Sequence, residues 1–198
     1  MIERDWHVLL VGGSSGTGKS AACAALLRTQ GVGSAEIDDL AAAVQAMTTP
    51  EQQPLLHYWS QNADSREWIA EEILELTLQV AGSLAPALRA VVDAHLDNGP
   101  PVIMEGDYLL PALLHDEPVN RPEVRAVFLY EPDEEQLVRN LTAREPDSPP
   151  QLMRARVSWL FGQWLRTEAD AQGVPALPVR PWDTLPDRIL AAATAFRR

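Results

Sequence analysis

Short runs of apolar residues alternate along this chain with longer segments in which apolar residues recur every three or four positions. The short runs predict buried strands, and the longer segments predict amphipathic helices. Strands are expected at residues 6–11, 34–37, 101–104, 124–130 and 176–179, and helices at residues 19–29, 40–47, 132–144, 151–172 and from 185 onward. Because strands and helices alternate, we predict a three-layer α/β fold around a mostly parallel, five-stranded sheet.

The middle of the chain departs from this alternation. Residues 48–64 contain two prolines and many polar side chains, which favours an irregular connection. Residues 66–98 carry apolar side chains at a period near 3.6, which is typical of a helix. Pro86 lies within that period and is expected to break or kink the helix, so the region predicts a helical pair.

The composition limits the class of protein. With 198 residues, of which 46% are hydrophobic, the chain is long enough for one domain with a substantial core and too short for two ordinary ones. No apolar run approaches the roughly 20 residues that cross a bilayer, and the first five residues lack the pattern of a signal peptide. We therefore expect a single cytoplasmic domain over residues 1–198, with no membrane partner.

Cysteine content and charge exclude further classes. A single cysteine, Cys23, rules out an internal disulfide and a cysteine-based zinc cluster, and the four histidines show no metal-ligand spacing. The net charge of −12 would repel a nucleic-acid backbone, so nucleic acid is not expected as a partner. The basic residues are 15 arginines and a single lysine, Lys19.

That lysine lies in a glycine-rich segment directly after the first predicted strand. The segment fits the pattern Gly-x4-Gly-Lys-Ser and comprises Gly13, Ser14, Ser15, Gly16, Thr17, Gly18, Lys19 and Ser20. Glycines at such positions let backbone amides wrap closely around a phosphate. The lysine can bridge the β- and γ-phosphates, the final serine can ligate Mg²⁺, and the threonine can add a phosphate contact. The motif predicts a site for ATP and Mg²⁺, in which the first two serines are either loop residues or further contacts.

Two other features narrow the kind of nucleotide-binding protein. GTPases that select guanine usually carry an Asn-Lys-x-Asp motif, which this chain cannot contain because its one lysine belongs to the phosphate loop. The third predicted strand ends in Glu105-Gly106-Asp107 rather than in the paired acids of many motor-like ATPases. At this length a kinase is the better fit.

The sequence resembles the P-loop kinases of nucleosides, nucleotides and small metabolites, and locally the chloramphenicol phosphotransferase and 2-phosphoglycerate kinase groups. The resemblance rests on residues 12–20, on Ile37-Asp38-Asp39 and on Ile103-Met104-Glu105-Gly106-Asp107, and it follows the order of elements across nearly the whole chain. It implies an ATP:small-molecule phosphotransferase. It also implies an acceptor-binding helical region at about 48–98 and a lid at about 139–158.

The resemblance assigns roles to three acids. In such kinases an acid after the second strand contacts the acceptor or accepts its proton, and Asp38 occupies that position. A carboxylate suits this work because the acceptor hydroxyl must lose a proton as the phosphoryl group arrives. Asp38 or Asp39 could instead cap the next helix. Glu105 and Asp107 follow the third strand, where they could hold Mg²⁺ through water or bind acceptor hydroxyls, or simply form a polar strand end.

Arginines surround the proline-rich loop at 145–150, where kinases of this type place a mobile lid. Arg144 and Arg156 are our candidates for binding the transferred phosphate, because a guanidinium keeps its charge and offers several donors. Arginines on a solvated helix face are the alternative explanation.

Two further residues are candidate ligand contacts. His57 stands beside Tyr58 and Trp59 in the predicted irregular connection, where it could bind the acceptor or serve as a reserve base, although packing beneath a loop is the simpler explanation. Arg180 and Trp182 follow the last predicted strand, where adenine packs in similar kinases, so Arg180 is a candidate nucleotide contact.

These features predict ATP-dependent transfer of a γ-phosphoryl group to a hydroxyl of a small-molecule acceptor. A nucleotide-binding regulatory or assembly protein, and a slow ATPase, are the alternatives that the sequence leaves open. A homodimer is also left open.

Overall fold

The sheet at the centre of the molecule orders every other element. The computed structural model describes residues 5–62 and 68–196. Within them lies a five-stranded sheet with the order β2-β3-β1-β4-β5, in which every pair of neighbours is parallel. The strands are β1 Val8–Gly13, β2 Gly33–Glu36, β3 Val102–Gly106, β4 Val124–Tyr130 and β5 Ala176–Pro178. The predicted α/β fold with a largely parallel sheet is therefore confirmed.

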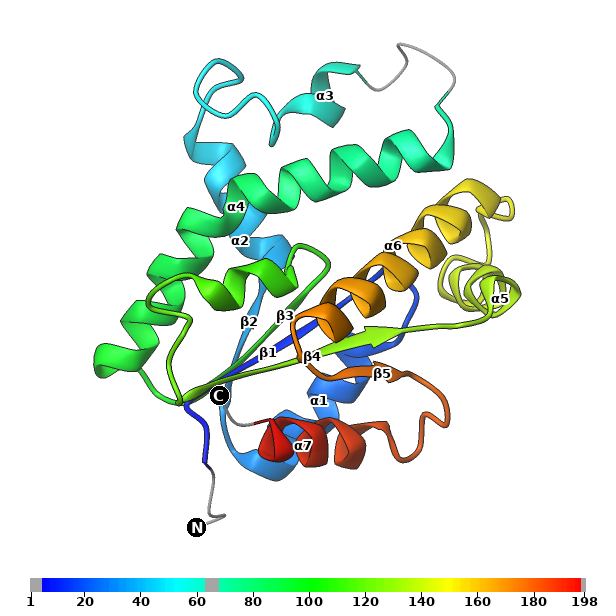
Figure 1. Cartoon of the computed structure of the whole chain (residues 1–198). Coiled ribbons are helices and arrows are strands. Elements are labelled where there is room, and N and C mark those ends of the chain that lie inside the picture. The colour runs from blue at the N-terminus through cyan, green and yellow to red at the C-terminus, as the bar shows by residue number, and fades with distance from the viewer. Residues whose placement is uncertain (1–4, 63–67, 197–198) are drawn as a thin grey trace.

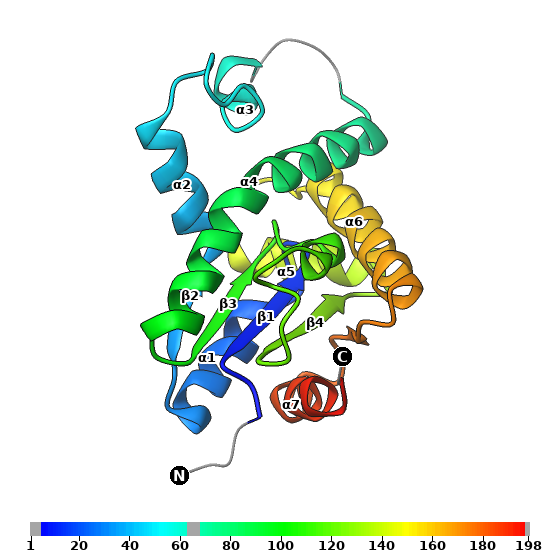
Figure 2. The same ribbon diagram turned by 60° about the vertical axis from the view of Figure 1, so that its left-hand side comes forward.

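Helices cover both faces of this sheet and make the three layers (Figure 1). They are α1 Lys19–Gln30, α2 Ile37–Met47, α3 Tyr58–Asn62, α4 Ala70–Asn98, the 3₁₀ helix η1 Pro111–His115, α5 Glu134–Arg144, α6 Leu152–Ala171 and α7 Leu185–Ala195. Figures 1 and 2 both place α1 and α7 on one side of the sheet, and α4 and α6 on the other. None of the helices in the described ranges is long and apolar enough to cross a membrane.

The alternation of side chains along the strands explains this layering. On β1, Val8 and Leu10 pack into the core beneath α4 and α6, whereas Leu9 and Val11 pack into the core beneath α1 and α7. Successive strand residues point to opposite faces, so a strand that is apolar throughout requires cover on both sides. A third, smaller cluster joins α5 to the start of α6.

The region that was predicted to be a helical pair is instead the single long helix α4, so that prediction was wrong. Pro86 lies inside the helix and removes the hydrogen bond to the carbonyl of Gly82, which bends a helix without necessarily ending it. Buried residues before and after Pro86, including Leu84 and Leu88, hold both halves against the same core. Figures 1 and 2 show the resulting bend.

Other boundaries differ from the sequence-based expectations in smaller ways. The short helix α3 lies within residues 48–64, where only irregular structure was expected, and η1 was not anticipated. The helix after β2 begins at Ile37 rather than near residue 40, because the fully buried Ile37 side chain fixes its first turn against the core. The expectations at residues 1–4, 63–64 and 66–67 lie outside the described residues.

Glycines allow the strands and α2 to approach each other closely. Gly12 of β1 pairs with Gly106 of β3. A Cβ atom on Gly106 would lie 2.5 Å from the Cβ atom of Ile37, and a Cβ atom on Gly12 would lie 2.5 Å from the ring of Phe128. Side chains at these positions would therefore push α2 or β4 away from the end of the sheet.

Replacing Gly106 with alanine should lower the free energy of unfolding by about 1–3 kcal/mol, because the added methyl group overpacks the contact with Ile37. The matched control is Gly82→Ala in α4, where a Cβ atom meets nothing within 4 Å. That change should raise the free energy of unfolding by about 0.5–1 kcal/mol, since alanine is the better helix former. Urea unfolding of both variants measures the difference, and equal stability of the two would contradict this packing.

Candidate active site

The phosphate loop joins β1 to α1 at the carboxyl edge of the sheet. Gly16 and Gly18 have φ values of 81° and 80°, in the left-handed region that favours glycine. Gly18 is the N-cap of α1, and no side chain caps this end of the helix. The first backbone N–H groups of α1 are therefore available to an anion, and the helix dipole adds to their attraction.

One side chain of the loop itself and one side chain of α5 hold this loop in shape. The Thr17 hydroxyl donates a hydrogen bond to the carbonyl of Ser14 at 2.7 Å and is fully buried. The side-chain amide of Asn140 on α5 donates a hydrogen bond to the carbonyl of Gly16 at 2.8 Å. Its amide oxygen accepts a hydrogen bond from the side chain of Gln136. Thr17 therefore uses its hydroxyl proton inside the loop and can offer a phosphate its backbone N–H.

Lys19 lies where the loop meets the end of β3. Its ammonium forms an ion pair with the carboxylate of Asp107, and both side chains are largely shielded from solvent. An ammonium has three protons, so this pair fixes the position of the charge and leaves donors free for phosphate oxygens. The structure thus brings together the predicted phosphate-binding lysine and one of the predicted acids.

Ser20 and Glu105 form a second polar pair beside Lys19. The Ser20 hydroxyl donates to the Glu105 carboxylate, which is 6% exposed. Burial raises the pKa of the Glu105 carboxyl, and the hydrogen bond from Ser20 and the charge of Lys19 partly oppose that rise. A hydroxyl and a carboxylate are oxygen ligands of the kind that Mg²⁺ accepts, so this pair fits the metal. No group of three His, Cys, Asp or Glu side chains in the described ranges could hold a metal alone, so phosphate and water would have to supply the remaining ligands.

Asp38 lies in the first turn of α2 and faces the same edge of the sheet. Neither Asp38 nor Asp39 caps the helix, whose N-cap is Glu36. The pKa of Asp38 is raised, first by removal of water around it and then by the negative charge of Asp107. A carboxylate with a raised pKa is a stronger base than an ordinary aspartate.

The phosphate loop borders two cavities. The larger, about 780 Å³, extends from the loop along α1 to α5 and to the segment before α7. The smaller, about 380 Å³, lies between the loop, α2, α4 and α6. The polar residues of the larger cavity are Lys19, Ser20, Asn140, Arg144 and Asp183, and those of the smaller are Ser14, Ser15, Asp38, Gln45, Thr77, Asp107, Tyr108, Arg154 and Ser158.

Two polar groups in the smaller cavity can serve a ligand directly. The Ser14 hydroxyl is buried, and within the described part of the chain it has no hydrogen-bond partner. The pKa of Tyr108 is raised by burial and by the charges of Asp38 and Asp107, which keeps its hydroxyl protonated and able to donate. Ser14 and Ser15 of the motif line the smaller cavity, whereas Gly16, Gly18, Lys19 and Ser20 line the larger.

The predicted lid arginines occupy different positions. Arg144 lines the larger cavity. Arg156 lines neither cavity, because its guanidinium donates a hydrogen bond to Glu134 at 2.8 Å and lies over the ring of Trp159. Arg154 instead lines the smaller cavity, donates to the Ser15 hydroxyl at 3.1 Å and pairs with Glu145. Helical spacing could have identified it, since positions 154, 158 and 161 share one face and the last two are buried.

His57 is not brought to either cavity. Its ring is hydrogen-bonded to the Thr48 hydroxyl at 3.2 Å, beyond the end of α2. The neighbouring rings of Tyr58, Trp59 and Trp68 pack against each other with centroids 5.4 to 5.9 Å apart. This aromatic segment packs together beside α4.

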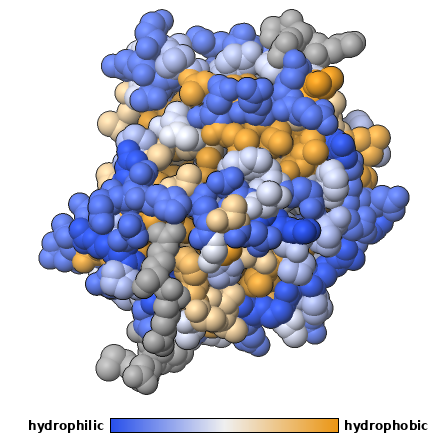
Figure 3. All heavy atoms as spheres, in the orientation of Figure 1, coloured by the Kyte–Doolittle hydropathy of each residue, from blue (hydrophilic) through white to orange (hydrophobic). Residues whose placement is uncertain are grey.

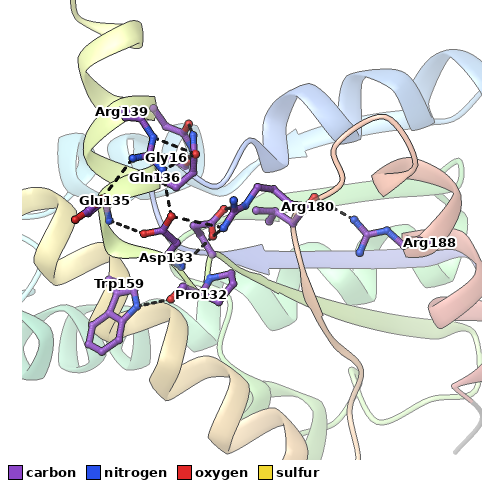
Figure 4. A network of polar contacts seen from close by, with 12 residues as sticks. Gly16, Pro132, Asp133, Glu135, Gln136, Arg139, Trp159, Arg180 and Arg188 are labelled. Carbon is purple, nitrogen blue, oxygen red and sulfur yellow. Dashed lines mark hydrogen bonds and ion pairs between the residues drawn. The ribbon is translucent and has the colours of Figure 1, made fainter.

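Arg180 stands beside the larger cavity, and its guanidinium is held by protein groups (Figure 4). It donates to both carboxylate oxygens of the fully buried Glu131, at 2.9 and 2.7 Å. Asp133, at the start of α5, lies 3.8 Å from the same guanidinium. The residues that line the cavity from this segment are Trp182 and Asp183, and the Trp182 ring lies next to Gly18. Arg180 therefore joins the segment before α7 to the start of α5, the two elements that form walls of the larger cavity.

The overall fold is shared with known kinases. No protein-family model and no curated protein matches the chain. Among solved structures, a gluconokinase from Sinorhizobium meliloti 1021 is similar with a TM-score of 0.52 at 19% identity, covering 98% of this chain and 94% of its own. A sugar kinase from Janibacter sp. HTCC2649 has a TM-score of 0.50 at 20% identity, covering 94% of each chain. At these identities the likeness shows that the fold is shared.

The motif predicts that ATP binds at the loop. Changing Arg180 to lysine should then weaken binding of ATP by roughly fivefold to tenfold, because an ammonium cannot span both oxygens of Glu131 and the Trp182 wall loses its anchor. Calorimetric titration with ATP and Mg²⁺ measures the change. Arg121→Lys is the matched control, since Arg121 pairs with Asp93 and Glu117, lines neither cavity and should change affinity less than twofold. Unaltered affinity in Arg180→Lys would refute the anchoring role.

Proposed function

We propose that this chain is an ATP-dependent phosphotransferase that moves the γ-phosphoryl group to a hydroxyl of a small-molecule acceptor. The observation that carries the proposal is the division of the space around one phosphate loop into two cavities, the smaller of which contains the Asp38 carboxylate. A phosphotransferase needs this arrangement, because donor and acceptor must meet in line at a single phosphorus atom.

The larger cavity is the proposed site of ATP. Its volume of about 780 Å³ suits a nucleotide, and its walls combine the N-terminus of α1 and Lys19 with the flat ring of Trp182. In this placement the phosphates lie on the loop, the Trp182 ring covers the base, and Arg144 approaches the phosphates from α5. The kinase names carried by the similar folds support the same assignment.

The smaller cavity is the proposed site of the acceptor. The acceptor oxygen attacks the γ-phosphorus, a new O–P bond forms, and the bond from the γ-phosphorus to the β–γ bridging oxygen breaks, so that ADP leaves. The proton of the acceptor hydroxyl passes to a carboxylate oxygen of Asp38. Lys19 balances the charge on the transferring group, and Ser14 and Tyr108 can orient the acceptor through hydrogen bonds.

Ser20 and Glu105 are the residues that would hold Mg²⁺, Ser20 through its hydroxyl and Glu105 through water. When bound, the metal neutralises phosphate charge. Arg154 is proposed to take the role on the transferred phosphate that was predicted for Arg156, because it already contacts the loop through Ser15. The hairpin of α5 and α6 then acts as the lid.

Replacing Asp38 with asparagine should lower kcat by about 10² to 10⁴-fold, the usual contribution of a general base, and leave the affinity for ATP unchanged. Coupled measurement of ADP production with an identified acceptor tests this. The matched control is Asp39→Asn, because Asp39 is the next residue on α2 and lines neither cavity. If Asp38→Asn retained the wild-type rate, Asp38 would not be the base.

The raised pKa of Asp38 makes a second prediction about pH. The base works only when ionised, so kcat/KM should fall as the pH drops through a pKa that lies above the ordinary aspartate value of 3.8. Asp107→Asn removes a negative charge near Asp38. Loss of this repulsion stabilises ionised Asp38 and so lowers the pKa of Asp38. The acidic limb of the pH profile should therefore move to lower pH in this variant. A limb that stayed in place or moved upward would rule out the coupling.

A further inference from the structure

An apolar groove lies beside the proposed acceptor cavity. It measures about 590 Å³ and lies between α3, the first turns of α4 and the start of α6. Its walls include Trp59, Ile73, Leu152, Met153, Arg154 and Val157. Figure 3 shows apolar side chains gathered between the positions that α4 and α6 occupy in Figure 1.

The groove and the smaller cavity share two walls. Arg154 and Val157 of α6 line both. On α4, Thr77 lines the cavity and Ile73, one turn earlier on the same face, lines the groove. The cavity and the groove are therefore neighbours along α4 and α6.

The two spaces differ in chemistry. The cavity presents the carboxylates of Asp38 and Asp107 and the hydroxyls of Ser14 and Thr77. The groove presents mainly aliphatic side chains and the ring of Trp59. The side chains of Leu152 and Met153 are 62% and 47% exposed, which is unfavourable for large apolar residues unless a ligand covers them.

We infer that the acceptor is amphipathic, with a hydroxyl-bearing head in the cavity beside Asp38 and an apolar or aromatic portion in the groove against Leu152, Met153 and Trp59. This inference rests on the proposed function, because it takes the cavity beside Asp38 as the place of the reacting hydroxyl. The groove then determines specificity. An acceptor with the same head group but no apolar portion would leave Leu152, Met153 and Trp59 exposed to water and would bind more weakly.

A matched pair of alcohols tests the inference. Glycerol supplies the head alone, and its phenyl ether, 3-phenoxypropane-1,2-diol, adds an aromatic portion for which the groove has room. Ligand-observed NMR titration gives the affinity of each, with ATP analogue and Mg²⁺ present. The phenyl ether should bind at least about tenfold more tightly, because its ring leaves water on binding.

The double variant Leu152→Ser, Met153→Ser should reduce that preference to threefold or less. Both side chains are exposed, so the changes should not disturb folding. Met47→Ser, at an 86% exposed methionine outside the groove, is the control and should keep the full preference. Equal binding of the two alcohols, or an unchanged preference in the double variant, would overturn the inference. The inference would also be overturned if the wild-type protein were a homodimer that the double variant dissociates, because a second copy of the chain would then cover Leu152 and Met153.

The same samples separate this inference from the proposed function. Transfer of phosphate to either diol, lost in Asp38→Asn, supports the reaction whether or not the phenyl group adds affinity. Preference for the phenyl ether combined with transfer that survives in Asp38→Asn would leave the groove as the tail site and remove Asp38 from catalysis.

Discussion

The ion pair between Lys19 and Asp107 ties the phosphate loop to the end of β3 and joins a wall of the larger cavity to a wall of the smaller. The pair exists because β1 and β3 are adjacent and parallel, so the segments that follow them emerge at the same edge of the sheet. Gly12 and Gly106 keep the two strands, Ile37 and Phe128 in close contact there. The close packing at Gly12 and Gly106 thus supports the position of the ion pair between Lys19 and Asp107.

Several elements converge on this point from distant parts of the sequence. The start of α2 carries Asp38, Asn140 of α5 holds the loop through Gly16, and Arg154 of α6 contacts Ser15. The buried carboxylate of Glu131 anchors Arg180 and so places the Trp182 wall. Lys19 is paired with Asp107 and Glu131 with Arg180, each across two elements, which keeps the site in shape while the Lys19 ammonium can still reach a phosphate.

The sequence was sufficient to predict what depends on local pattern. Glycine spacing after an apolar run predicted the phosphate loop, and alternating strands and helices predicted the parallel sheet. Contacts between residues that are distant in the sequence could not be predicted from local patterns. The choice between Arg154 and Arg156, the capture of Arg180 by Glu131 and the position of His57 all depend on how helices dock. A helical pair was predicted around Pro86, where a break or a kink was expected, because the sequence does not show that one core buries residues on both sides of it.

The fate of the γ-phosphoryl group is the most direct test of this account. Phosphorus NMR of the purified protein with ATP, Mg²⁺ and hydroxylated acceptors follows every phosphate in a single sample. The account predicts a new phosphate monoester signal that grows at the same rate as ADP, and that is absent when Lys19 is replaced by alanine. Release of inorganic phosphate alone, at a rate independent of acceptor, would contradict phosphoryl transfer and identify the chain as an ATPase.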